Sequence, residues 1–364
     1  MYSKIAFVVY DFSIIGGAER VSVNIANELS AYYDVTIVSL TGKCVHPSYI
    51  INDAVKIRFL NIKGDQLRKQ IITAFFPLVS YLRKEKIAVA LIEGTYCGII
   101  CSLSKLFVKT KLIFCDHGSL MSQYNEKKTR TIRKIASSLC DHTVVLTERS
   151  RKDYIQFFKM KQGKITCIYN WLNEERINPQ RVYDVNSKTI LSVGRFSAEK
   201  GYDLLIEVAS IVLPQHPSWR WTIFGQGEVF NDIKMEVMKR KLEGQLLLAG
   251  EVNNLNDAYE HAAMLVLPSY REGMPLALLE AKCYKLPLVS FDIISGPREI
   301  IMDNQNGYLI PPYDVKEMAR KINLLIDDKQ LRETMSEHAY DNIEPFRKET
   351  ILDTWINLID ELGG

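Results

Sequence analysis

Two glutamates, Glu272 and Glu280, stand eight residues apart in the segment Arg271–Glu280, across a turn and the start of an apolar helical pattern. Pro275 between them suits the first helical position, and Gly273 lets the backbone come close to a ligand. Free amides at a helix start bind anions, and Glu280 would lie roughly 7.5 Å along the helix axis. The pattern predicts a site that binds a polyhydroxylated, phosphate-bearing molecule at both ends. The alternative is an amphipathic helix with two solvated glutamates.

A second group of candidates follows the apolar run Thr189–Val193. Arg195 and Lys200 flank a short loop there, and two cations at the carboxyl end of a strand predict a diphosphate clamp. The alternative is a pair of surface cations. Gly225 lies in the glycine turn between the next strand and helix, so the same arrangement occurs twice in succession. Val252 follows the strand after that, where backbone groups would line the edge of a pocket for the base.

In the first half of the chain, Gly16 and Gly17 separate an apolar strand from a helix and would let a phosphate or sugar approach the helix start. Their turn, which includes Ile14 and Ile15, is not G-x-G-x-x-G, and this argues against a dinucleotide-binding domain. His117 follows another apolar strand and would face a ligand as a hydrogen-bonding or proton-carrying group, although a lone histidine is often structural. The sequence has no D-x-D and no metal-ligand spacing, so we expect neither a metal nor a cofactor.

Short apolar strands alternate with helical patterns in both halves, as in open parallel sheets covered by helices. We expect strands at residues 4–10, 35–40, 55–60, 88–92, 111–115, 142–146 and 164–168, and then at 188–193, 219–224, 245–249, 264–267, 288–291 and 307–310. Helices are expected between them, as at 19–31 and 71–84, and after the last strand at 314–327, 330–340 and 350–362. These elements predict an α/β protein with two Rossmann-like, doubly wound domains that face a central cleft, where such folds bind ligands.

The chain of 364 residues is too long for one ordinary core, in agreement with two domains. The polar stretch Asn173–Ser187, which contains Pro179 and has no apolar periodicity, holds the best linker candidate. We therefore expect an N-terminal domain at 1–178, a linker at 179–187, a C-terminal domain at 188–345, and a final helix in 346–364 that is a candidate to cross back to the first domain.

Charge is unevenly distributed along the chain. Residues 1–180 hold 26 Lys and Arg against 15 Asp and Glu, a net charge of +11, whereas residues 181–364 hold 20 against 28, a net charge of −8. Such asymmetry suggests that the first half faces an anionic surface. Cations bracket the apolar stretch Ile71–Leu82, and more follow the His117 loop, among them Lys127, Lys128, Arg130 and Arg133. These cations predict a basic face that docks on anionic lipid, against the alternative of an ordinary core helix with solvated cations.

Seven cysteines without a C-x-x-C pair fit a reducing cytosol. The N-terminus leads directly into an apolar strand without a signal-peptide pattern, and Ile71–Leu82 is too short to span a bilayer. We therefore expect a cytoplasmic protein that is at most peripheral on the inner face of the cell membrane.

Taken together, these motifs resemble family 4 of the retaining, nucleotide-sugar-dependent glycosyltransferases, which have the two-domain architecture called GT-B. The resemblance covers nearly the whole chain and rests on the order and spacing of many weak motifs. They are Gly16 to Arg20, His117, Tyr169-Asn170, Gly194-Arg195, Lys200-Gly201, Pro268-Ser269, Glu272 to Glu280, Gly296 to Ile301 and Asn306-Gly307. Lys285 departs from the pattern, because the family usually has glycine there. The stretch Ser290–Pro297 looks most like bacterial enzymes that build capsule, exopolysaccharide or lipopolysaccharide chains.

The resemblance implies a role for each candidate residue. Arg195 and Lys200 would hold the donor diphosphate, Glu280 would bind the ribose, and Gly17 would approach the phosphates from the opposite domain. His117 would contact the donor sugar near its 6-position. The rest of the sugar site would come from Glu272 and the backbone of Gly273, Met274, Pro275 and Leu276.

The implied reaction is transfer of a hexose or N-acetylhexosamine, with retention at the anomeric carbon, from UDP rather than GDP to a saccharide acceptor. The expected acceptor is a lipid-linked saccharide. Negative charge develops on the leaving diphosphate, so cations and helix-terminal amides would stabilise it without a metal. No carboxylate is obviously placed as a covalent nucleophile, so a front-face route, in which the leaving phosphate oxygen takes the acceptor's proton, fits better than a double displacement. Nucleic acid is not expected among the partners.

Two other classes of function remain compatible with the sequence. A nucleotide-sugar epimerase or a phosphorylase would use the same fold, and an epimerase would convert its nucleotide sugar without an acceptor. A catalytically silent nucleotide- or carbohydrate-binding subunit is a further alternative. Five intact residues argue against it: Glu272, Glu280, Arg195, Lys200 and His117.

Overall fold

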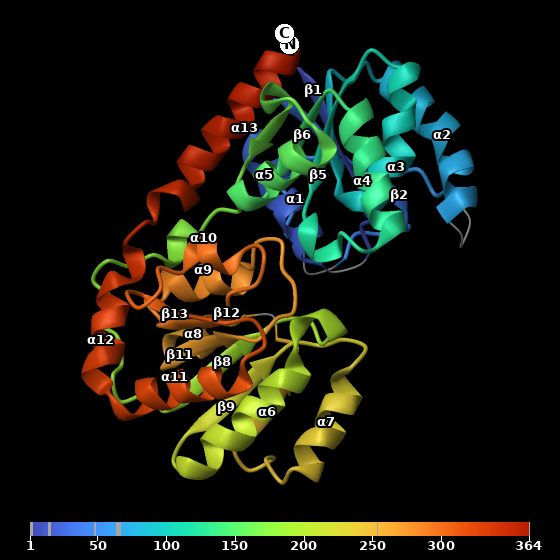
Figure 1. The fold of residues 1–364 in the computed structure, drawn as a ribbon. Coiled ribbons are helices and arrows are strands. Elements are labelled where there is room, and N and C mark those ends of the chain that lie inside the picture. Colours follow the sequence, from blue (N-terminus) through green and yellow to red (C-terminus); the bar gives the residue numbers. More distant parts are fainter. Residues whose placement is uncertain (1–2, 14–15, 47–48, 63–66, 253, 364) are drawn as a thin grey trace. The chain divides into compact units, whose positions relative to one another are not determined.

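Figure 1 shows the computed structural model, which describes residues 3–13, 16–46, 49–62, 67–252 and 254–363. Ile14 and Ile15 of the first glycine turn, and the side chains of residues 67–71, lie outside the described residues. The chain divides into two units: unit 1 comprises Met1–Asn170 with Glu349–Gly364, and unit 2 comprises Trp171–Lys348.

Unit 1 contains a seven-stranded parallel sheet in the order β3-β2-β1-β4-β5-β6-β7. Its strands are β1 (Lys4–Asp11), β2 (Asp34–Thr41), β3 (Lys56–Phe59), β4 (Val89–Glu93), β5 (Lys111–Asp116), β6 (His142–Val145) and β7 (Ile165–Cys167). Each of the strands expected in the first half is confirmed to within one residue at either end. The pairing of Ile5 with both Val35 and Val89 makes β1 a central strand, and its residues 5–9 are buried.

Helices cover both faces of this sheet (Figure 1). They are α1 (Gly17–Leu29), α2 (Leu67–Lys84), α3 (Gly94–Ser102), α4 (Lys127–Leu139), α5 (Glu148–Phe158) and α13 (Lys348–Gly363). Because crossover connections are right-handed and the strand order reverses after β3, α1 covers one face and α2 to α5 cover the other. Trp355 of α13 lies with Val21 and Ile25 of α1, so the C-terminal helix packs on the α1 face.

Unit 2 contains a six-stranded parallel sheet in the order β10-β9-β8-β11-β12-β13. Its strands are β8 (Thr189–Val193), β9 (Arg220–Phe224), β10 (Leu246–Gly250), β11 (Met264–Leu267), β12 (Leu288–Phe291) and β13 (Gly307–Ile310). All six expected strands are confirmed to within one residue at either end. Two parallel sheets with helices on both faces confirm the α/β class.

The helices of unit 2 cover both faces of its sheet, and one face has a core that contains Trp221, Leu205 and Ile322. They are α6 (Tyr202–Val212), α7 (Phe230–Lys239), α8 (Asn256–Glu260), α9 (Leu276–Cys283), α10 (Pro297–Ile300), α11 (Val315–Asp327) and α12 (Lys329–Glu337). Helix α12 ends earlier than expected, because a 3-10 turn, His338–Tyr340, takes its last residues. Pro275 was expected at the first helical position but lies at the N-cap of α9 in an extended conformation, with φ −74° and ψ 109°.

The segment 179–187, which the sequence predicts as a linker, lies within unit 2. The backbone carbonyl of Val185 accepts a hydrogen bond from Arg332 at 2.7 Å, and the Ser187 hydroxyl donates to the carbonyl of His261 at 2.6 Å. The segment is therefore attached to the body of this unit by specific hydrogen bonds.

Candidate active site

The carboxyl edge of the unit 2 sheet carries most of the predicted site residues. Arg195 follows β8, Gly225 follows β9, Val252 follows β10 and Glu272 follows β11. The strands β10, β9, β8 and β11 are consecutive neighbours in this sheet. Since the carboxyl ends of parallel strands meet at one edge, the topology brings these four positions to the same side of unit 2.

Lys200 and Glu272 are in direct contact at this edge. The Lys200 ammonium lies 2.7 Å from Oε1 and 2.9 Å from Oε2 of Glu272. The Ser269 hydroxyl donates a further hydrogen bond of 2.7 Å to Glu272 Oε1. The Glu272 side chain is only 7% exposed, so these partners fix its carboxylate in position. A fixed carboxylate beside a fixed ammonium suits a ligand that has hydroxyls next to phosphates.

Glycines shape the loops around this ion pair. Gly201 is the N-cap of α6 with φ +66°, and a Cβ there would collide with the carbonyl of Pro268. Gly225 has φ +146°, and a Cβ there would collide with the carbonyl of Gly194. Any other residue at either position would force the strand-end loops apart, so these glycines permit the close loop packing that holds Arg195 and Lys200 at the edge.

Tyr202 stabilises the loop that follows β8 through contacts with Gly194 and Phe196. Its hydroxyl donates a 2.8 Å hydrogen bond to the carbonyl of Gly194, and its ring stacks on Phe196 at 4.3 Å between centroids. Burial raises the pKa of Tyr202, and the negative charge of Glu272 raises it further. The hydroxyl therefore stays protonated and serves as a hydrogen-bond donor to the loop.

The predicted helix start is present at α9. Gly273, Met274 and Pro275 lead into it, and Leu276 is its first residue. The Ser295 hydroxyl holds the carbonyl of Gly273 at 3.3 Å, which fixes the approach of the turn. The first amides of α9 have no acceptor within the helix and carry its positive dipole end, so they can bind an anionic or hydroxyl-bearing group.

Glu280 is the fifth residue of α9, as the sequence predicts. The hydroxyl of the fully buried Tyr259 donates a 2.8 Å hydrogen bond to Glu280 Oε2. Arg176 Nη1 lies 3.9 Å from Glu280 Oε1. Tyr259 also stacks on Tyr284 at 5.3 Å, so a rigid aromatic pair orients the Glu280 carboxylate. Sequence reasoning missed Tyr259, because it lies 21 residues before Glu280 on a different helix.

Arg195 and Val252 lie at the exposed rim of the edge. The Arg195 side chain is 58% exposed, and its Nε lies 3.8 Å from Glu228 Oε2. Val252 is 40% exposed. The structure therefore brings Lys200 and Glu272 together, whereas Arg195 approaches a different carboxylate across the loop after β9.

The predicted residues of unit 1 lie at the carboxyl edge of the other sheet. His117 follows β5, and its Nε2 lies 2.5 Å from Oε2 of Glu93 at the end of the neighbouring strand β4. Burial lowers the pKa of His117, but the hydrogen bond and charge of Glu93 outweigh it, so the pKa is raised overall. Gly16 caps α1, and its amide donates to the Tyr49 hydroxyl at 3.2 Å. Glu93 was not predicted as a site residue, although a lone acid at the end of an otherwise apolar strand was a signal for it.

His117 and Glu93 line a pocket within unit 1. Its wall also includes Asp116, Asn170 of the last segment before unit 2, and Trp355 of α13. The charged side chains of the pocket come from the ends of β4 and β5, the segment after β7 adds Asn170, and α1 and α13 supply apolar side chains. The pocket is small, with space for about one water molecule beside the imidazole of His117.

Arg133 was predicted to belong to a basic face that docks on anionic lipid, and for this residue the prediction is wrong. Its guanidinium is buried, and Nε lies 2.9 Å from Asp116 Oδ2. Tyr154 also donates a 2.7 Å hydrogen bond to that carboxylate, and Asp116 Oδ1 accepts from the amide of Gly118. Arg133 thus fixes the loop that carries His117 and does not face the solvent.

Comparison with known proteins gives two matching family models. The model described as Glycosyltransferase Family 4 matches residues 15–176, and the model described as Glycosyl transferases group 1 matches residues 173–342. The two matches together span both units.

Full-length relatives and solved structures agree with these matches. The chain is 27% identical to the amylovoran biosynthesis glycosyltransferase AmsD of Erwinia amylovora, over 98% of this chain and 99% of the relative. It is 25% identical, over 99% of each chain, to an alpha-1,4-N-acetyl-D-galactosaminyltransferase of Campylobacter jejuni named for a diphosphoundecaprenol-linked acceptor. The fold is similar to that of a Staphylococcus aureus TarM variant in complex with Fondaparinux, alpha-GlcNAc-glycerol and UDP, with a TM-score of 0.84, 20% identity, and coverage of 99% of this chain and 100% of that one.

Proposed function

The chain belongs to family 4 of the glycosyltransferases and has the GT-B fold, and from this membership we propose that it is a retaining hexosyltransferase that uses a UDP-sugar. It is a glycosyltransferase of bacterial polysaccharide synthesis. The proposed donor is a UDP-hexose or a UDP-N-acetylhexosamine. The observation that carries this proposal is the contact between Lys200 and Glu272 beside the start of α9, where a diphosphate and sugar hydroxyls would meet their partners together.

The proposed donor site lies at the carboxyl edge of unit 2. Lys200 and Arg195 bind the diphosphate, Glu272 and the amides at the start of α9 bind the sugar hydroxyls, and Glu280 binds the ribose. Gly225 and Val252 lie at the edge of the base site. The bound UDP in the structurally similar TarM variant supports UDP as the nucleotide.

The proposed reaction breaks the bond between the anomeric carbon and the diphosphate oxygen and forms a bond from that carbon to the acceptor oxygen. The leaving phosphate oxygen takes the acceptor's proton on the same face of the sugar, so the configuration is retained. Lys200, Arg195 and the α9 amides stabilise the negative charge that develops on the diphosphate. These groups supply the positive charge, so we propose that no metal is required.

Two motifs of unit 1 complete the assignment. His117 contacts the transferred sugar, and the backbone at Gly16 and Gly17 contacts the phosphates. Burial lowers the pKa of His117, but Glu93 raises it overall, which favours the protonated imidazole that would donate a hydrogen bond to a sugar oxygen.

The proposed acceptor is a lipid-linked saccharide at the inner face of the cell membrane. The Campylobacter jejuni relative, which is named for an undecaprenol-linked acceptor, supports this choice. The net charge of +11 in residues 1–180 also favours an anionic surface as a partner.

A nucleotide-release screen tests the proposal. The chain is incubated with UDP-, GDP- and ADP-sugars, with and without lipid-linked saccharide acceptors and with EDTA. We expect UDP release that depends on the acceptor, persists in EDTA and is lost in Lys200→Ala, and NMR of the product should show the donor's anomeric configuration. Conversion of the nucleotide sugar without an acceptor would indicate an epimerase, and dependence on inorganic phosphate would indicate a phosphorylase. Nucleotide binding without turnover on any acceptor would favour a silent binding subunit.

A further inference from the structure

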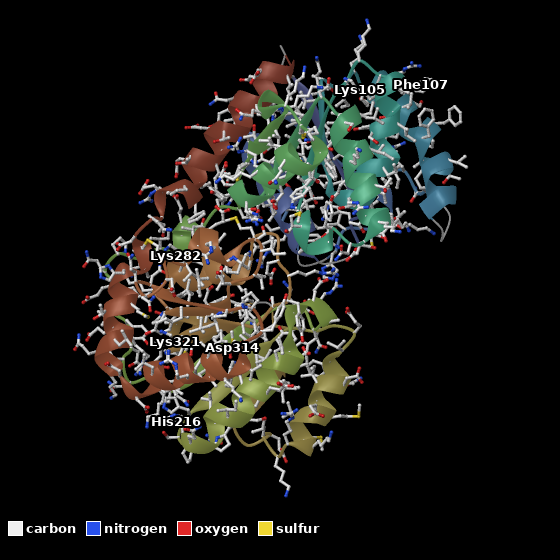
Figure 2. All side chains as sticks on the ribbon, viewed as in Figure 1. Lys105, Phe107, His216, Lys282, Asp314 and Lys321 are labelled. Atoms are coloured by element: carbon white, nitrogen blue, oxygen red, sulfur yellow. The ribbon has the colours of Figure 1, made fainter. Side chains whose placement is uncertain are left out.

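An exposed apolar patch lies on unit 1, in segments of the chain that are separate from the candidate site residues. It comprises Ile72 and Phe76 of α2 and Leu106 and Phe107 of the 3-10 turn after α3. These side chains are 67%, 73%, 73% and 49% exposed, respectively. Figure 2 labels Phe107 beside Lys105 at this edge of the unit. We call these four residues the apolar patch.

The patch is continuous because Phe75 joins its two halves. The ring of Phe75 lies edge-to-face with Phe76 at 5.2 Å and with Phe107 at 5.1 Å between centroids. Phe75 itself packs on the buried core of this face of the sheet. The exposed rings therefore rest on a fixed base, and contiguous exposed apolar surface of this kind marks an interaction site.

The charges around the patch are almost all positive. Residues 72–86 and 103–111 contain a single acid, Glu85, which pairs with Lys4 at 3.3 Å. Arg83 borders the patch directly, because its Nε donates a 2.7 Å hydrogen bond to the carbonyl of Phe107. Lys105 is paired with Asp141. The cations of the two segments are Arg83, Lys84, Lys86, Lys105, Lys109 and Lys111.

We propose that the apolar patch docks on an anionic lipid surface, with its four side chains at the acyl boundary and the surrounding cations on the phosphate groups. Apolar burial and attraction to anionic headgroups together give interfacial binding of this kind. No helix among the described residues is long and apolar enough to cross a membrane. The inference rests on the proposed lipid-linked acceptor for its purpose, and it names the surface that brings the chain to that acceptor.

A second copy of the chain fits this surface less well than a membrane. In a two-fold dimer the same patch meets itself, so the bordering cations would face cations without acids to neutralise them. The structure also shows that one cation expected on the basic face cannot contribute to lipid binding. Arg133 of α4 is bound to Asp116 in the interior, so the expected basic face on α4 loses one of its members.

The test is co-sedimentation of the full-length chain with phosphatidylcholine vesicles, with and without phosphatidylglycerol. We expect binding only to the anionic vesicles, and weaker binding as added salt shortens the Debye length. The double variant Phe76→Gln, Leu106→Gln should bind at least roughly tenfold more weakly. The matched control is Ile50→Gln, because Ile50 is 87% exposed but lies beside α1 on the opposite face of the sheet. It should bind as the unaltered chain does.

Three results would overturn the inference. They are equal binding by the double variant, equal binding to neutral vesicles, and a dimer of the unaltered chain that the double variant converts to a monomer. UDP release with a detergent-dispersed acceptor separates this inference from the proposed function. Normal release without vesicle binding rejects the docking surface alone, and vesicle binding without release rejects the proposed function alone.

Discussion

The Lys200 ammonium lies 2.7 Å from Oε1 and 2.9 Å from Oε2 of Glu272, across 72 residues of sequence. Lys200 is proposed to bind the donor diphosphate and Glu272 the donor sugar, but in this structure the two side chains bind each other. A diphosphate must therefore compete with Glu272 for the charge of Lys200. The ion pair therefore links nucleotide binding to sugar binding. When the diphosphate takes Lys200, the Glu272 carboxylate is released and can bind the sugar.

The first prediction separates the two partners of this ion pair. Lys200→Ala should weaken UDP binding by about 1.5–3 kcal/mol, the range for hydrogen bonds to charged groups. Glu272→Gln should leave UDP affinity equal or higher, because Lys200 loses its competitor, while turnover falls with the lost sugar contact. Calorimetry with UDP and steady-state kinetics measure the two effects. Glu199→Gln, which alters an exposed acid of the same loop that pairs with Arg271, is the control. Equal losses of UDP affinity in Lys200→Ala and Glu272→Gln would contradict the competition.

The second prediction concerns Tyr259, which orients Glu280 through a 2.8 Å hydrogen bond. Tyr259→Phe keeps the stacked ring but removes that bond, so UDP binding should weaken by about 0.5–1.5 kcal/mol. A UDP analogue that lacks both ribose hydroxyls should bind the variant and the unaltered chain equally, since Glu280 then has no ligand to orient. Calorimetry with both ligands gives the coupling energy.

Tyr340→Phe is the matched control for Tyr259→Phe. It removes a tyrosine hydroxyl that donates 2.7 Å to the carbonyl of Cys283 in the same unit, without contacting Glu280. Tyr340→Phe should change the affinity for UDP and the affinity for the analogue by the same factor. If Tyr259→Phe weakened the binding of UDP and of the analogue equally, Tyr259 would act on the fold of the unit and not on the ribose site.

The strands were predictable because each is a short apolar run that ends at turn residues, and this signal is local. The same locality explains why Glu272 and Glu280 could be assigned, since both lie in one turn and helix. Glu93 and Tyr259 could not be assigned, because each acts on a partner more than 20 residues away on another element. Only the order of the strands and the packing of the helices bring those partners together.

Two further features required the folded chain. Helical spacing does not say which face of α4 is buried, and Arg133 shares the inner face with Ala136, where Asp116 neutralises it. The apolar patch combines Phe76 with Leu106 and Phe107, which a sequence window treats as separate segments. The expected apolar stretch at residues 71–82 thus contains both core residues, such as Leu78, and exposed ones.

The third prediction explains the departure at Lys285. This residue has φ +58°, and the amides of Lys285 and Leu286 donate to the carbonyls of Lys282 and Ala281. These bonds form the Schellman end of α9, whose left-handed position favours glycine. Lys285 Nζ donates to the carbonyl of Pro179 at 2.8 Å, which offsets part of the backbone strain. Lys285→Gly should therefore be more stable than Lys285→Ala by about 1 kcal/mol, because both lose the bond and only alanine keeps the strain.

Chemical denaturation of the two Lys285 variants measures this difference. Lys234, an exposed residue inside α7, is the matched control. There the order should reverse, with alanine more stable than glycine by about 1 kcal/mol, because glycine is a poor helix former. Alanine favoured at both positions would show that the left-handed conformation of Lys285 carries no measurable strain.

The last prediction is a pH dependence of stability that arises from His117 and Glu93. The contact with Glu93 outweighs burial and raises the pKa of His117 above its ordinary value of about 6.5. The folded chain therefore holds the proton more tightly than the unfolded chain, and the pair stabilises the fold fully below that value. The stabilisation is lost as the pH rises through the folded-state pKa. Glu93→Gln should thus lower the free energy of unfolding by about 1.5–3 kcal/mol at mildly acid pH, with a smaller difference at alkaline pH. Urea denaturation at several pH values measures this, and Glu85→Gln, at an exposed pair, should show little change. A difference that stays constant with pH would mean that Glu93 acts on the fold without sharing the proton of His117.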